Sequence, residues 1–147
     1  CWTWADSMLS DQLTAFGDMH EHAGFHAFQS MVASLSFRPE YYNANRAKLL
    51  GSGGVWGALE GRIPTHLRFI EACLGHDIRP HLSDIVAPTL VIHAGEDMIT
   101  GPRTTMPLEE GLPNSVGVSM DRVAHVVAGK EEKIIFGEIL FDFLNAH

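Results

Sequence analysis

The spacing of apolar residues separates a helical stretch of the chain from a strand-containing one. Between residues 10 and 75, apolar side chains recur every three or four positions, as Leu13, Phe16 and Met19 do. This period is typical of amphipathic helices, and no strand-like run interrupts it. The pattern therefore predicts four successive helices, which begin at Ser10 and then cover residues 25–36, 39–50 and 64–74.

After residue 76 the pattern changes to that of buried strands. Thr89–His93 is an apolar run that follows Pro88, and such runs are typical of a parallel strand that is covered on both faces. Ser115–Met120 is a second short strand-like run, and a broad apolar face after Gly129 predicts a C-terminal helix. The residues Cys1–Trp4 include large side chains of high strand propensity, which favours a further strand at this point.

These elements predict an α/β fold with an inserted helical cap. Residues 1–9 are expected to form a core strand and to lead into the cap, and residues 10–75 to form the cap itself. Residues 76–147 are then the C-terminal part of the α/β core.

A carboxylate and an imidazole follow the two predicted strands. Asp97 stands in the turn after the first of them, and His125 follows the second. The carboxyl ends of parallel strands share one edge of a sheet, where α/β proteins bind ligands, so the two side chains are expected to meet there. An aspartate can orient a histidine and stabilise its cation, and the histidine can act as a general base. A turn aspartate can also merely bond its own backbone, and the neighbouring Glu96 is a second candidate acid.

This arrangement resembles the C-terminal half of the α/β-hydrolase family, and most closely its enol-lactonase and haloperoxidase-like members. The resemblance depends on residues 76–85, read as H-D-I-R-P-H-L-S-D-I, on P-T-L-V-I at 88–92, and on the acid and histidine that follow. It implies a triad in the chain order nucleophile, acid, base, with Asp97 as the acid and His125 as the base. The resemblance also implies a strand, followed by a polar turn, over Trp2–Asp6, just before the cap. Some relatives carry the acid after that strand, which leaves Asp6 as an alternative.

The resemblance implies a hydrolase that acts on an ester or a lactone without a cofactor or a metal. No G-x-S-x-G motif occurs, and Gly51-Ser52-Gly53 follows no strand. We therefore expect a second polypeptide, most simply the N-terminal product of a cleaved precursor, to carry the nucleophile and the oxyanion hole. The alternatives are a relative that performs acyl transfer, perhydrolysis or C–C cleavage, and a non-catalytic small-molecule receptor.

Several large apolar side chains could line a substrate pocket between cap and core, although such a stripe is also typical of ordinary core. They are Trp2, Trp4, Met8, Phe16, Met19, Phe28 and Met31. Cys1 could act as an N-terminal nucleophile, but it falls where the family has a buried strand. His93, at the end of the predicted strand, is expected to be structural.

Composition narrows the class of partner. The formal charge of −8 and the scattered basic residues argue against nucleic acid or an anionic membrane surface as a partner. No apolar stretch has the length of a membrane span. Two cysteines make no disulfide framework, so a reducing compartment such as the cytoplasm is expected. The 9 histidines show no metal-ligand spacing.

Overall fold

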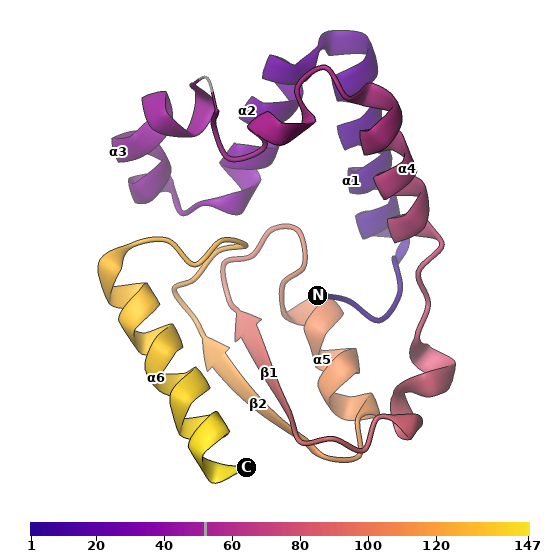
Figure 1. Ribbon diagram of the computed structural model, residues 1–147, viewed down its shortest axis with the longest axis vertical. Helices are drawn as coiled ribbons and strands as arrows, with labels where there is room; N and C mark the ends of the chain where they lie inside the picture. The colour runs from indigo at the N-terminus through magenta and orange to yellow at the C-terminus, as the bar shows by residue number, and fades with distance from the viewer. Residues whose placement is uncertain (52) are drawn as a thin grey trace. The chain divides into compact units, whose positions relative to one another are not determined.

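A computed structural model describes residues 1–51 and 53–147, and the described chain divides into two compact units (Figure 1). One unit consists of Trp4–His76, and the other joins Cys1–Thr3 to Asp77–His147. Ser52, the serine of the sequence Gly51-Ser52-Gly53, lies outside the described residues. No helix within the described part has both the length and the apolar character needed to cross a bilayer.

The unit Trp4–His76 is helical, as its apolar period predicts. Its helices are α1 (Ser7–Asp18), α2 (Phe25–Ser36), α3 (Pro39–Leu50) and α4 (Ile63–Leu74), with a π-helical turn at Met19–Ala23 and a 3₁₀ turn at Gly57–Leu59. The predicted start of the first helix at Ser10 is wrong. Asp6 is the N-cap, because its carboxylate accepts the N–H of Leu9 at 2.9 Å, so α1 begins three residues earlier at Ser7.

Two histidines share the core of this helical unit. His20 is 1% exposed and His66 is 7% exposed, and their Nδ1 atoms lie 2.9 Å apart. The His20 ring stacks on Phe28 with a centroid distance of 5.3 Å. A hydrogen bond between two Nδ1 atoms needs one of them to carry a hydrogen and the other to keep its lone pair. The pair is therefore compatible with at most one proton on the two facing nitrogens.

Acidification is expected to destabilise this unit. Burial first, and the neighbouring His20 second, hold the pKa of His66 below its ordinary value of 6.5. Between the lowered pKa and 6.5 the unfolded chain binds more protons at this residue than the folded chain does. The contribution of His66 to stability is therefore fully present above this range and is lost as the pH falls through it.

Urea unfolding measured near pH 7.5 and near pH 5.5 tests this expectation, because the two values bracket the ordinary titration of histidine. His66→Gln should reduce the difference between the two free energies of unfolding. His26→Gln is the matched control, since His26 is exposed on α2 of the same unit. An equal pH dependence in the wild type and in His66→Gln would contradict the expectation.

The second unit holds a small parallel sheet between helices. It contains a 3₁₀ turn at Arg79–Asp84, strand β1 (Thr89–Ala94), helix α5 (Pro102–Gly111), strand β2 (Ser115–Met120) and helix α6 (Lys130–Ala146). The strands pair in parallel over their whole length, from Thr89 opposite Ser115 to Ala94 opposite Met120. Both predicted strands and the C-terminal helix are thus confirmed, and α5 and α6 lie on opposite sides of the sheet (Figure 1).

The two faces of β1 are unequally covered. Toward α5, Val91 is 2% exposed and packs with Leu82 and Leu112, and His93 is 6% exposed. On the other face, Leu90 and the apolar side chains of β2 border a pocket of about 340 Å³ that α6 closes with Ile139 and other residues. No residue of α6 is fully buried. The α5 side of the sheet is therefore a packed core, and the α6 side is only partly filled.

The strand predicted near the start of the chain is wrong. No strand forms over Trp2–Asp6, where only Trp4 makes an isolated β-bridge. High strand propensity gives a strand only when a neighbouring strand supplies a hydrogen-bonding ladder, and these residues have none in the described chain. Helix α5 begins at Pro102, whose fixed φ favours the first turn of a helix.

Candidate functional site: an aspartate–histidine pair at the strand ends

The turn after β1 is tied to the end of β2 by backbone hydrogen bonds. The N–H of Gly95 donates to the Met120 carbonyl at 3.0 Å, and the N–H of Glu96 donates to the Val123 carbonyl at 2.9 Å. A Cβ atom at position 95 would lie 2.6 Å from the Asp121 carbonyl oxygen, so only glycine allows this close approach. The turn that carries Asp97 is thereby held next to the segment that carries His125.

The Asp97 carboxylate is almost completely enclosed, with its side chain 5% exposed. One oxygen, Oδ1, accepts the N–H groups of Ile99 and Thr100, both at 2.8 Å. The other oxygen, Oδ2, accepts the Thr100 hydroxyl at 3.1 Å. These bonds fix the direction of the carboxylate, as in an aspartate that caps a turn.

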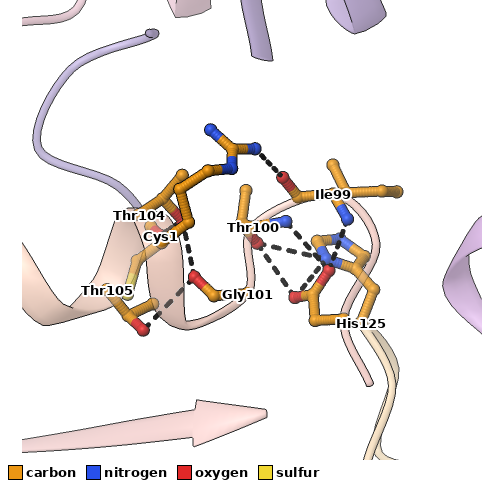
Figure 2. Close-up of polar contacts among 9 residues, drawn as sticks. Cys1, Ile99, Thr100, Gly101, Thr104, Thr105 and His125 are labelled. Atoms are coloured by element: carbon orange, nitrogen blue, oxygen red, sulfur yellow. Dashed lines mark hydrogen bonds and ion pairs between the residues drawn. The ribbon is translucent and has the colours of Figure 1, made fainter. Parts of the chain in front are cut away.

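His125 meets the same carboxylate. Its Nδ1 lies 3.0 Å from Asp97 Oδ2 and 3.2 Å from the Thr100 hydroxyl. Ile99, Thr100 and His125 therefore all contact the same carboxylate group, Ile99 through Oδ1, His125 through Oδ2 and Thr100 through both (Figure 2). Among residues 1–51 and 53–147, Nε2 of His125 has no hydrogen-bond partner. With its side chain 34% exposed, the imidazole can present Nε2 outward while Nδ1 donates to the carboxylate.

The surroundings of Asp97 keep it ionised. Burial alone would raise the pKa of the carboxyl group. The hydrogen bond and the charge of His125, together with the N–H groups of Ile99 and Thr100, outweigh burial and hold the pKa of Asp97 below its ordinary value. Asp97 is therefore a carboxylate at neutral pH, which is the state that orients an imidazole and stabilises its cation.

The pair borders a pocket of about 160 Å³ at the carboxyl ends of the strands. Asp97, Thr100 and His125 provide its polar wall. Apolar side chains provide much of the remainder, among them Ile92, Met120, Val127 and Phe136. A small apolar pocket beside a few convergent polar groups is the usual form of a small-molecule site.

The alternative candidates lie in other surroundings. Asp6 serves as the N-cap of α1. The side chain of Glu96 is exposed, whereas Asp97 next to it holds the imidazole. Cys1 lines the same pocket as His125, and its carbonyl accepts the Thr104 hydroxyl at 3.3 Å. The geometry thus favours Asp97 as the acid, and a role for the Cys1 thiol stays a prediction.

None of the apolar residues predicted as substrate contacts lines this pocket. Phe16 and Phe28 are buried in the helical unit and contact each other edge to face at 6.3 Å. Met8 is 52% exposed and Met31 is 43% exposed. The remaining three, which are Trp2, Trp4 and Met19, are partly buried. A role of any of the seven in substrate binding stays a prediction.

Sequence reasoning missed Thr100, which touches both members of the pair. Its signal was the spacing D-x-x-T, in which a hydroxyl three residues after an aspartate can reach back to the carboxylate.

No group of three or more His, Cys, Asp or Glu side chains able to hold a metal occurs among the described residues.

No protein-family model matches the chain, and no curated protein matches it. Solved structures do. An α/β hydrolase enzyme, MGS-M2, from a Medee basin deep-sea metagenome library superposes with a TM-score of 0.82 at 20% identity, over 99% of this chain and 54% of that one. The enol-lactonase of Burkholderia xenovorans LB400 gives 0.73 at 20% identity, over 92% and 50%. An esterase from Exiguobacterium antarcticum gives 0.69 at 17% identity, over 92% and 48%.

The chain thus spans about half the length of the structures that it matches. The match includes the helices of Trp4–His76 as well as the strands, α5 and α6, since it covers 92–99% of the chain. At these identities the likeness concerns the fold. This chain has the fold of the C-terminal part of an α/β hydrolase, with a helical cap.

Proposed function

We propose that this chain supplies the acid and the base of a hydrolase that cleaves an ester or a lactone with a nucleophile–His–Asp triad. The observation that carries the proposal is the bond of 3.0 Å between His125 Nδ1 and Asp97 Oδ2 at the mouth of a pocket. Two further features support it, namely the carboxylate held below its ordinary pKa and the unpartnered Nε2 of the imidazole among the described residues.

The roles follow from these positions. Asp97 accepts Nδ1–H and so leaves the lone pair of His125 on Nε2. Nε2 takes the proton of the nucleophile as the nucleophile attacks the carbonyl carbon, and then gives that proton to the leaving alkoxide. A water molecule attacks the acyl intermediate in the same way, and its proton passes through Nε2 to the nucleophile. Asp97 stays ionised throughout and stabilises the imidazolium.

The substrate class has two supports. The apolar wall formed by Ile92, Met120 and Phe136 suits the hydrocarbon part of an acyl group or lactone ring. Two of the proteins with the same fold are named as an enol-lactonase and an esterase.

No step of the proposed reaction requires a cofactor. The two cysteines, Cys1 and Cys73, are free thiols, which suits the reducing cytoplasm expected from the sequence.

The nucleophile and the oxyanion hole are proposed to come from a second polypeptide segment that adds strands to this sheet. A parallel sheet of 2 strands is unusual by itself, because parallel sheets are normally wide and covered on both faces. The partly filled space between the sheet and α6 also supports a wider sheet in the assembled protein. The matched structures are about twice the length of this chain, which leaves room for such strands.

A fluorophosphonate probe applied to the assembled protein tests the proposal, together with hydrolysis of a short-chain p-nitrophenyl ester. We expect covalent labelling of one serine outside these residues, and loss of both labelling and turnover in His125→Ala. Heat-denatured protein is the control for non-specific labelling. A folded assembly that neither takes up the probe nor hydrolyses the ester would contradict the proposal and would favour a non-catalytic receptor.

A further inference from the structure

His93 contacts α5 through both of its ring nitrogens. Its Nδ1 lies 2.6 Å from the hydroxyl of Thr105, and its Nε2 lies 2.6 Å from the carboxylate of Glu109. The imidazole is 7% exposed, and the Glu109 side chain is 37% exposed. Bonds this short between a buried imidazole and a carboxylate are charge-assisted and directional. The side chains of His93, Thr105 and Glu109 make no hydrogen bond with Asp97 or His125, the proposed acid and base, among the described residues.

The two residues of α5 that contact His93 lie on either side of Pro107, which weakens the helix. Pro107 lies inside the helix, where it has no N–H to donate and its ring crowds the carbonyl four residues earlier. Thr105 and Glu109 stand four residues apart, and therefore on one helix face, with Pro107 between them. His93 thus binds the turns before and after the proline to β1, and replaces part of the rigidity that the helix lacks.

The Thr105 end of this contact leads to the Asp97 turn. The N–H of Thr105 donates to the Gly101 carbonyl at 3.3 Å, and its hydroxyl lies 3.4 Å from the same oxygen (Figure 2). Gly101 in turn approaches Asp97 so closely that an added Cβ would lie 2.5 Å from the Asp97 carbonyl oxygen. Thr105 also lines the pocket beside His125. The first turn of α5 and the turn that holds the acid are therefore packed as one piece.

At the other end of this contact, the Glu109 carboxylate packs against the strand β2. A Cβ atom at Gly117 of β2 would overlap the carboxylate of Glu109, so the absence of a side chain there makes room for it. The carboxylate consequently sits over β2 while it holds a histidine of β1. This position of the Glu109 carboxylate fixes α5 against both strands. A substitution at Gly117 can therefore disturb the contact between His93 and Glu109 without a change at Glu109 itself.

We propose that His93, held by Glu109, is a positioning residue that clamps α5 to the sheet and thereby fixes the Asp97 turn and the Thr105 wall of the pocket. The inference rests on the proposed function, since the geometry that it protects is that of the Asp97–His125 pair. His93 and Glu109 act through Thr105 and Gly101 and do not touch the reacting atoms.

The test compares Glu109→Leu with Glu109→Gln, in which an amide oxygen still accepts Nε2–H. Gly117→Ala displaces the carboxylate from the opposite side, and His93→Phe removes both contacts. Glu110→Leu is the matched control, because Glu110 is an exposed acid on the same helix. Each variant is assembled as the wild type is, and kcat, KM and thermal unfolding are measured, together with the titration of the Asp97 carboxyl carbon by NMR.

We expect Glu109→Leu, Gly117→Ala and His93→Phe to lower kcat about tenfold to a hundredfold with KM little changed, because a small misplacement of a catalytic group costs that much. They should also raise the pKa of Asp97 toward its ordinary value, since loosening the turn weakens the bonds that depress it. Glu109→Gln should restore most of both properties, and Glu110→Leu should alter neither.

An Asp97 titration that is unchanged in folded Glu109→Leu and Gly117→Ala would overturn the inference, even if both variants are less stable. The paired Glu109 variants decide the question if His93→Phe does not fold. The titration needs no substrate. It therefore tests the positioning role even if the wild type hydrolyses no ester, an outcome that would count against the proposed function alone.

Discussion

Asp97→Asn is expected to lower kcat for ester hydrolysis about 10⁴-fold, the size of effect known for replacing a triad aspartate by asparagine. The asparagine amide can still accept the N–H groups of Ile99 and Thr100 through its oxygen, so the turn should persist. Its NH₂ group then faces His125 Nδ1 and donates to it. This bond favours the tautomer with hydrogen on Nε2, which has no lone pair for the proton of the nucleophile.

His125→Ala removes the proposed base and should reduce kcat by a similar factor or more. Because triad members act as a unit, the double variant should be little worse than the worse single variant. Thermal unfolding should show both single variants folded. Near-wild-type turnover in either of them would exclude the pair as the acid and base.

Asp6→Asn is the matched control for Asp97→Asn, since the chemical change is the same. Asn caps a helix as well as Asp does, so α1 should keep its N-cap and activity should be close to that of the wild type. If Asp6→Asn abolishes turnover while Asp97→Asn does not, then the acid is Asp6.

The second large effect concerns residues 1–147 expressed alone. We expect them to have no esterase activity and to self-associate, and to gain activity only with a second segment that brings strands and a nucleophile. In the described chain β1 pairs only with β2, and unpaired strand edges bind one another readily. Several apolar side chains of this unit are also about half exposed or more, namely Val116, Ile134, Ile135, Phe141 and Leu144.

Sedimentation velocity and thermal unfolding of the isolated residues, each with an esterase assay, provide the measurement. Loss of buried backbone hydrogen bonds costs about 1–3 kcal/mol for each unsatisfied group, a large share of the ~5–15 kcal/mol that stabilises a domain. Broad unfolding and concentration-dependent association are therefore expected. A monomer that unfolds cooperatively and hydrolyses esters at the full rate of the assembly would show that no second segment is needed.

Much of the site follows from local patterns. A continuous apolar run before a turn predicted β1, and the carboxyl-end rule for parallel strands placed Asp97 and His125 at one edge. The structure brings them to 3.0 Å. This inference succeeds because the connection from β1 to β2 runs through the helix α5, and strands joined by such a crossover lie parallel and end at the same edge.

The errors have the opposite cause. Trp2–Asp6 has strand propensity but no paired strand in the described chain. A ladder and a buried face are properties of pairs of segments. One segment alone does not specify its partner, so propensity and period leave both outcomes open.

The sequence by itself indicated most of the helices, the strands β1 and β2, and the sheet edge at which Asp97 and His125 meet. Only the tertiary structure decided which polar groups from distant parts of the chain contact one another. Thr105 lies 12 residues and Glu109 lies 16 residues after His93, and no recognisable motif links the three. In the structure, His93 nevertheless contacts both. The same holds for His20 and His66, which are 46 residues apart. Contacts of this kind depend on how β1 packs against α5 and α1 against α4, and packing is set by the whole core rather than by any local pattern.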